Sequence, residues 1–239
     1  MTDENRQSIL SHLNELRWRL VKSAVAILIG SVIALIFGNL IKDLLQLPYD
    51  RAFPGEENTL QVLAPTEEFS VLMKIAFFGG AVLASPAVIY QIWMFINPAL
   101  TRREKKWAIP IVISCTVLFC AGVAVGYQTM GRGLAFLLGI FDDVANNLRL
   151  TDYFSFSIRF LLAFGISFLY PVFLFTAAAA NVVTSKQLAR GRRWAVLLVV
   201  TGAAIITPTG DVLTLAMLSV PLYAFYEITY WLVRLVLRK

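Results

Sequence analysis

The chain has 239 residues, of which 58% are hydrophobic and only 15% are charged, with a formal net charge of +6. Soluble domains carry about 25% charged residues, so composition excludes an ordinary water-soluble domain, and the lipid bilayer must take up much of the apolar surface. No nucleic-acid-binding motif competes to explain the positive charge. The sequence predicts an all-α polytopic membrane protein.

The first 22 residues are polar and charged, so we expect an amphipathic helix that stays at the cytosolic membrane surface rather than a cleaved signal peptide. Its apolar residues recur at helical spacing: Ile9, Leu13, Leu16 and Leu20. Glu15, Arg17 and Arg19 fall off this stripe and are expected to face solvent or lipid headgroups.

Six membrane spans are expected within one membrane domain over residues 1–239. A span needs about 20 apolar residues to cross a hydrocarbon core of about 30 Å. Five segments satisfy this: residues 23–40, 75–96, 107–130, 160–183 and 212–236. Residues 194–207 reach only about 21 Å as a helix. We count them as a short fifth span, which forms a hairpin with the sixth because only the TPTGD loop separates the two.

The distribution of basic residues predicts the orientation. Most of the 21 Lys and Arg residues lie at the two termini and in two loops, residues 97–106 and 184–193. Basic loops remain on the cytoplasmic side, so both termini are expected in the cytoplasm, with the chain in the cell membrane. Residues 41–70 then form the first outside loop, and Pro48 is expected to shape it as a helix breaker.

No catalytic, metal or cofactor site is indicated. Cys115 and Cys120 lie five residues apart within the third predicted span, and no Cys or His partner gives metal-ligand spacing. We expect them to be small buried apolar residues. His12 is the only histidine, so no His-based catalytic set is available.

Four strings together resemble the TatC family, the membrane receptor component of the twin-arginine protein translocase. They are HLNELRWRL at residues 12–20, SPAVIYQIWMFINPALTRREKK at 85–106, AFGISFLYPV at 163–172 and TPTGDV at 207–212. The resemblance covers essentially the whole chain, in order. It implies a non-enzymatic receptor that binds twin-arginine signal peptides and starts the export of folded proteins. It also implies an oligomeric complex with TatA-like and TatB-like single-span partners, driven by the proton-motive force.

The resemblance also implies a signal-peptide site on the cytosolic face, formed by Glu15, Glu104 and Phe95. The chemistry agrees, because the planar fork of an arginine pairs bidentately with a carboxylate, and lysine does not reproduce that geometry. Nearby arginines are expected to support the negative charge of the carboxylates and to disfavour a cation of poor geometry: Arg17, Arg19, Arg102 and Arg103.

Each of these residues also has a simpler interpretation. Glu15 and Arg19 are spaced i,i+4 on a helix, where a surface ion pair contributes about 0.3–0.5 kcal/mol. Glu104 within RREKK is, taken alone, typical of a solvated loop. Phe95 is as well explained by a core anchor as by a site residue.

Two acids near the spans have structural or partner roles in this interpretation. Asp211 matches a family acid and would cap the last span. Glu227 lies inside that span, where an ionisable group is costly and is either paired or functional. The main alternative function is a secondary transporter for a small cationic solute, with Glu227 as its coupling acid. The sequence shows no internal repeat of the kind that many such transporters carry.

The chain departs from the family pattern at four positions, one of which is Leu215, where the family has a glutamine shortly after the acid of the last span. Many members have a glutamate where this chain has Leu169, so a polar contact to the partner or signal helix is absent or supplied elsewhere. Gln128 and Arg132, at the outer end of the third span, are more polar than the family pattern. The sequence gives no account of these two.

Overall fold

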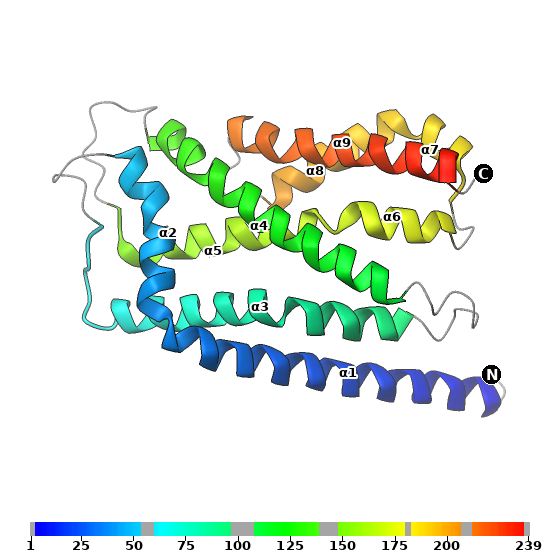
Figure 1. The fold of residues 1–239 in the computed structure, drawn as a ribbon, viewed down its shortest axis with the longest axis horizontal. Helices are drawn as coiled ribbons and strands as arrows, with labels where there is room; N and C mark the ends of the chain where they lie inside the picture. The colour runs from blue at the N-terminus through cyan, green and yellow to red at the C-terminus, as the bar shows by residue number, and fades with distance from the viewer. Residues whose placement is uncertain are drawn as a thin grey trace. The chain divides into compact units, whose positions relative to one another are not determined.

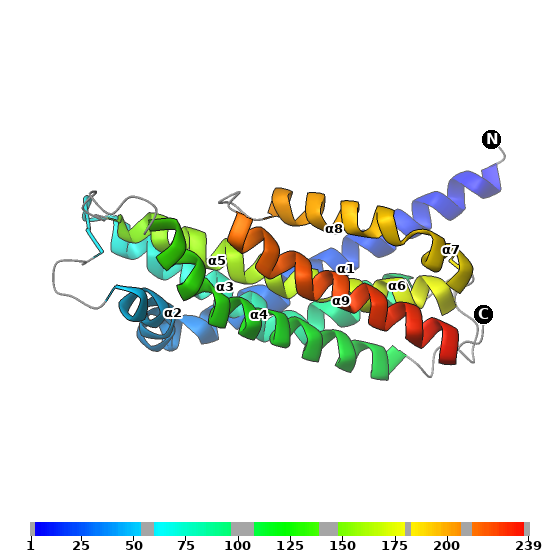
Figure 2. The same cartoon turned by 90° about the horizontal axis from the view of Figure 1, so that it is seen from above.

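The computed structural model describes residues 3–53, 60–96, 108–138, 148–179, 183–206 and 212–236. In these ranges the chain is helical with no strand, which confirms the all-α prediction (Figures 1 and 2). The helices are α1 (Asp3–Ile36), α2 (Gly38–Ala52), α3 (Glu67–Ile96), α4 (Ala108–Leu138), α5 (Leu150–Ser167), α6 (Tyr170–Ala179), α7 (Ser185–Arg190), α8 (Arg192–Ile206) and α9 (Val212–Val236).

Four segments of the described chain are long and apolar enough to cross a membrane. They are Leu10–Ile36, Glu67–Phe95, Ile109–Ala135 and Leu150–Ala178. Helix α8 has 15 residues, which gives a length of about 22 Å. It is therefore shorter than the hydrocarbon core, as the sequence predicted for this segment.

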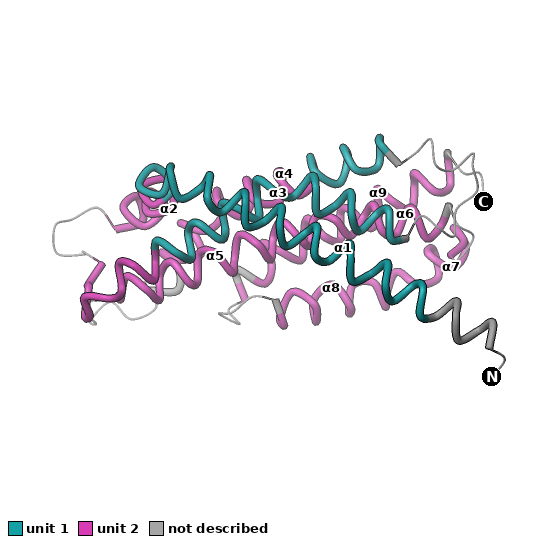
Figure 3. Tube along the Cα trace, turned by 90° about the horizontal axis from the view of Figure 1, so that it is seen from below, with its two compact units in different colours: residues 1–41, 72–117 teal, residues 42–71, 118–239 magenta. Residues whose placement is uncertain are grey.

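The chain divides into two compact units, coloured separately in Figure 3. The first comprises residues 1–41 and 72–117. In it, α1 and α3 approach so closely that a Cβ atom placed on Gly80 would lie 2.5 Å from the backbone nitrogen of Ser31 and 2.7 Å from its Cα. A Cβ atom on Gly30 would likewise lie 2.7 Å from the carbonyl oxygen of Gly80. Small residues permit such close helix packing in membrane proteins.

The second unit comprises residues 42–71 and 118–239. Here α4 and α5 pack through Gly122 and Gly165, with Phe164 and Phe168 against the first glycine and Phe119 against the second. Helix α9 packs against α6, α7 and α8. Two clusters of buried side chains form the core of this unit, one centred on Phe160, Phe164 and Leu218 and the other on Tyr226 and Val233.

Pro48 lies inside α2 and is buried, so it does not end the helix as its breaker role predicted. A proline has no N–H and cannot donate to the carbonyl four residues earlier, here Leu44. The hydroxyl of Tyr127 donates to that carbonyl instead, at 2.7 Å. Tyr153 donates to the adjacent carbonyl of Leu45 at 2.6 Å. Side chains from α4 and α5 therefore satisfy the carbonyls around the proline.

The predicted span at residues 160–183 is interrupted. Helix α5 ends at Ser167 and α6 begins at Tyr170, with Phe168 and Leu169 in the turn between them. Pro171 explains the break, because it cannot donate to the carbonyl of Ser167 and its ring clashes with that carbonyl in a continuous helix. Leu169, the apolar departure from the family pattern, therefore lies in a turn and is half-buried.

Candidate functional site

The carboxylate of Glu15 is paired with Arg19 on the same face of α1. The Nε of Arg19 donates to Oε1 of Glu15 at 3.0 Å, and a second guanidinium nitrogen donates to the same oxygen. The Glu15 side chain remains 34% exposed. The second carboxylate oxygen accepts no hydrogen bond from a residue that the structure describes, so solvent or an incoming cation can reach this group.

Phe95, near the end of α3, stacks on His12 of α1, one helical turn before Glu15. The ring centroids are 4.5 Å apart and the planes are inclined by 21°. The structure thus brings Phe95 to the helix that carries Glu15, within a single unit. Arg17 is exposed on the same helix. Glu104 and Arg103 lie outside the described residues, so their placement beside Glu15 stays a prediction.

A second charged group lies at the start of α8. Arg192 donates to Oε2 of Glu227 in α9 at 2.8 Å, and Tyr223 donates to Oε1 at 3.1 Å. The guanidinium of Arg192 also lies 4.7 Å from the ring centre of Tyr230. Hydrogen bonding to Glu227 raises the pKa of Arg192, which therefore keeps its charge. Both carboxylate oxygens of Glu227 are occupied, which ties α8 to α9.

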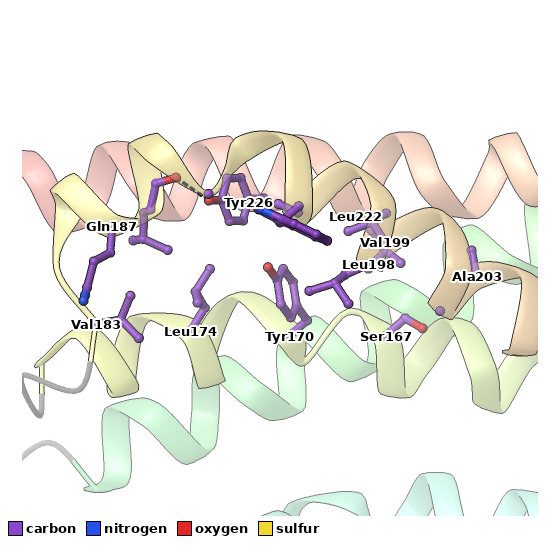
Figure 4. Close-up of a pocket in the computed structure, with 15 residues that line it drawn as sticks. Ser167, Tyr170, Leu174, Val183, Gln187, Leu198, Val199, Ala203, Leu222 and Tyr226 are labelled. Atoms are coloured by element: carbon purple, nitrogen blue, oxygen red, sulfur yellow. Dashed lines mark hydrogen bonds between the residues drawn. The ribbon is translucent and has the colours of Figure 1, made fainter.

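An apolar cavity of about 500 Å³ lies among α6, α7, α8 and α9 (Figure 4). Tyr170 and Leu174 line it from α6, while Leu198 and Gly202 line it from α8. Tyr226 and Leu188 also line it, and the hydroxyl of Tyr226 donates to the carbonyl of Leu188 at 2.5 Å.

Among the described residues that line this cavity, Ser167 has a buried polar atom without a partner. The Oγ of Ser167 is buried and forms no hydrogen bond with any residue that the structure describes. Ser167 is the last residue of α5, two positions before Leu169. An unsatisfied buried hydroxyl costs free energy that a polar group from a bound partner would recover.

The remaining predicted residues are placed as follows. Asp211 lies outside the described residues, so its capping role stays a prediction. Cys115 and Cys120 are both free thiols, the first buried and the second exposed, so the expectation of burial holds for Cys115 and is wrong for Cys120. No group of three or more His, Cys, Asp or Glu side chains with metal-ligand geometry occurs in the described ranges.

The family model for the Sec-independent protein translocase protein (TatC) matches residues 11–221. The chain belongs to the TatC family. It is 37% identical over 235 residues to the TatC protein of Aquifex aeolicus, covering 97% of this chain and 96% of the relative. It is 36% identical to that of Desulforapulum autotrophicum, covering 95% and 84% of the two chains.

A crystal structure of the twin-arginine translocase receptor TatC superposes with a TM-score of 0.80 at 37% identity, covering 95% of this chain and 100% of that one. The resemblance drawn from the four strings is therefore confirmed. Sequence reasoning on this TatC chain missed the partner of Glu227, because Arg192 lies 35 residues away. It also missed Tyr127 and Tyr153, whose hydroxyls bond to the carbonyls near Pro48.

Proposed function

We propose that the chain is the signal-peptide receptor and core subunit of a twin-arginine translocase, without a catalytic step of its own. Membership of the TatC family supports this role. One observation supports a site at Glu15, a half-buried carboxylate whose hydrogen-bond partner among the described residues is its own helix neighbour, Arg19. Glu15 lies one turn from the stacked pair His12–Phe95. An incoming arginine can take the place of Arg19, whose two guanidinium nitrogens share one oxygen of Glu15, and can pair bidentately with both carboxylate oxygens.

The proposed topology has six spans in a bacterial-type cell membrane, with both termini in the cytoplasm. The four long apolar segments supply four of them, and α8 and α9 supply the short hairpin. The basic residues flanking α8 at 190–193 and those before α4 support the cytosolic placement of these ends. Glu104 would then lie on the same side as Glu15 and provide the second carboxylate.

Site-specific cross-linking of a twin-arginine signal peptide tests the receptor role. Glu15→Ala and Glu104→Ala are each expected to abolish the cross-link while the protein stays in the membrane. Lys186→Ala, which removes a charge from another basic loop, is the matched control and should leave the cross-link intact. Unchanged cross-linking in both glutamate variants would overturn the site. The transporter alternative loses its acid, because Glu227 is already bound by Arg192.

We further propose that the cavity bounded by α6 and α8 receives the transmembrane helix of a single-span partner of the TatA or TatB type. Three observations support this. Helix α8 is too short to span an unperturbed bilayer, so lipid packs poorly beside it. A Cβ atom placed on Gly202 would meet no atom within 4 Å, which leaves an open notch in the helix surface. The unpartnered hydroxyl of Ser167 offers a hydrogen bond.

Co-purification of a partner with two matched serine variants tests the docking proposal. Ser167→Ala should reduce partner recovery, whereas Ser219→Ala should not, because Ser219 is buried and unpartnered but does not line the cavity. Lengthening α8 by several leucines should also reduce recovery. Normal recovery from the lengthened protein and from Ser167→Ala would refute docking at this surface.

A further inference from the structure

A second cavity, of about 500 Å³, lies between α2 and the end of α4. Its volume falls within the range of about 300–1,000 Å³ typical of small-molecule sites. Its lining is polar and basic, unlike that of the cavity beside α8: Arg51 and Ala52 with Pro48 from α2, and Tyr127, Gln128, Gly131, Arg132 and Ala135 from α4. No carboxylate is among these residues.

Helices α2 and α4 approach closely at this cavity. A Cβ atom on Gly131 would lie 3.1 Å from the carbonyl oxygen of Pro48, so only glycine fits easily at this position. The hydroxyl of Tyr127 is bound to the carbonyl of Leu44. The two arginines therefore project, with exposed side chains, from neighbouring helices that pack closely at Gly131.

Neither arginine has a carboxylate within 4.0 Å among the residues that the structure describes. Arg51 lies in the last turn of α2, where the helix dipole alone favours a cation. Arg132 has no such explanation, since α4 continues to Leu138. Two guanidinium groups that line one cavity repel each other, and an anion between them removes that cost.

The position of the cavity along the membrane-spanning segment indicates which kind of anion can reach it. The apolar segment of α4 runs from Ile109 to Ala135, so Arg132 lies three residues, about 4.5 Å, from its end. This is the level at which long basic side chains reach the lipid headgroups. Guanidinium groups bind phosphate oxygens bidentately, and the amide of Gln128 adds another donor.

We propose that this cavity binds a phosphate ester, held by Arg51 and Arg132, and that its source is the headgroup of an anionic phospholipid. Under the topology proposed above, the lipid belongs to the extracytoplasmic leaflet. The site accounts for Gln128 and Arg132, the two polar departures from the family pattern. It is independent of the signal-peptide site, which lies in the other unit of the chain.

Native mass spectrometry of the full-length protein in neutral detergent tests the proposal with three probes. Phosphatidylglycerol should bind, and a galactosyl diacylglycerol without phosphate should not. Soluble glycerol 1-phosphate distinguishes a lipid headgroup from a free phosphate ester as the ligand. Weaker binding than that of phosphatidylglycerol supports the lipid, and equal binding overturns it. Equal binding of the phosphate-free lipid would overturn phosphate recognition altogether.

Charge-matched variants locate the site. Arg51→Gln/Arg132→Gln should weaken phosphatidylglycerol binding by at least about tenfold, because both charged contacts to the phosphate are lost. Lys42→Gln/Arg159→Gln removes the same charge from the same unit outside the cavity and should leave affinity unchanged. Arg51→Lys/Arg132→Lys keeps the charge and should bind with intermediate affinity. The assignment is refuted if Arg51→Gln/Arg132→Gln and Lys42→Gln/Arg159→Gln lose the same affinity for phosphatidylglycerol. Melting temperatures without lipid show whether the two double variants are equally folded.

Discussion

Replacing Glu15 by glutamine separates its two roles, as an ion-pair partner and as a receptor. The Glu15–Arg19 pair is partly exposed and spaced i,i+4, so its loss should cost only about 0.3–0.5 kcal/mol of folding stability. The loss of a carboxylate acceptor for an incoming arginine costs about 1.5–3 kcal/mol. At 1.4 kcal/mol for each tenfold change, Glu15→Gln should weaken a twin-arginine signal peptide by about tenfold to a hundredfold.

Arg19→Gln should act in the opposite direction on the same site. In the unliganded chain the peptide must displace Arg19, which costs about 0.5 kcal/mol. With that competitor removed, affinity should rise by about twofold. Both variants lose the same ion pair, so their stabilities should be similar, and only Arg19→Gln keeps the carboxylate. They change the net charge in opposite directions, so the preference for arginine over lysine decides the test.

Fluorescence anisotropy with labelled twin-arginine and twin-lysine peptides, on protein in nanodiscs, measures both effects. The wild-type chain should prefer the arginine peptide, and this preference should shrink in Glu15→Gln because lysine lacks the planar fork that pairs with the carboxylate. The reasoning is refuted if Arg19→Gln loses as much affinity as Glu15→Gln. It is equally refuted if Glu15→Gln retains the full preference for arginine.

Three further predictions concern stability, measured by thermal melting in detergent. Gly80→Ala should cost about 1–3 kcal/mol through overpacking, and adding Ser31→Ala should not restore stability because the clash includes backbone atoms. Gly202→Ala should stabilise the chain by up to about 1 kcal/mol, because the added methyl group meets no atom and alanine favours the helix. A loss of stability would contradict the open space beside Gly202. Tyr127→Phe should cost about 0.5–1.5 kcal/mol of stability, because the carbonyl of Leu44 loses its hydrogen bond. This cost should nearly vanish in a Pro48→Ala background, where the restored N–H of residue 48 binds that carbonyl. An equal cost in both backgrounds would show that Tyr127 does not compensate for the proline.

The sequence predicted features that depend on local spacing. The pairing of Glu15 with Arg19 follows from their four-residue separation, and the shortness of α8 follows from the apolar run between its flanking charges and loop. The break after Ser167 is equally local, since it depends on Pro171 alone. The apolar run continues through the break, so hydropathy alone predicts one uninterrupted span at residues 160–183.

Features that depend on a distant partner were not predictable in this way. Pro48 alone indicates a broken helix, and only the arrival of Tyr127, 83 residues away from the carbonyl it binds, makes the continuous α2 tolerable. Glu227 alone is compatible with a coupling acid or a paired carboxylate, and the structure shows that it is paired with Arg192. In each case the chain pattern shows the unsatisfied group, and the fold determines what satisfies it.

The same distinction separates structural polar groups from candidate binding groups in this chain. Within the helices most hydroxyls return to their own backbone; Ser157 and Thr229, for example, donate to carbonyls four residues earlier. Such groups are already satisfied and offer a partner little. Groups left without a partner that also line a cavity are different: Ser167 in the cavity beside α8, and the two arginines between α2 and α4. A buried hydroxyl such as that of Ser167 is costly while it is unpaired, and the two exposed arginines at the headgroup level carry charges without a carboxylate partner among the described residues, so these are the positions where a bound molecule can add polar contacts.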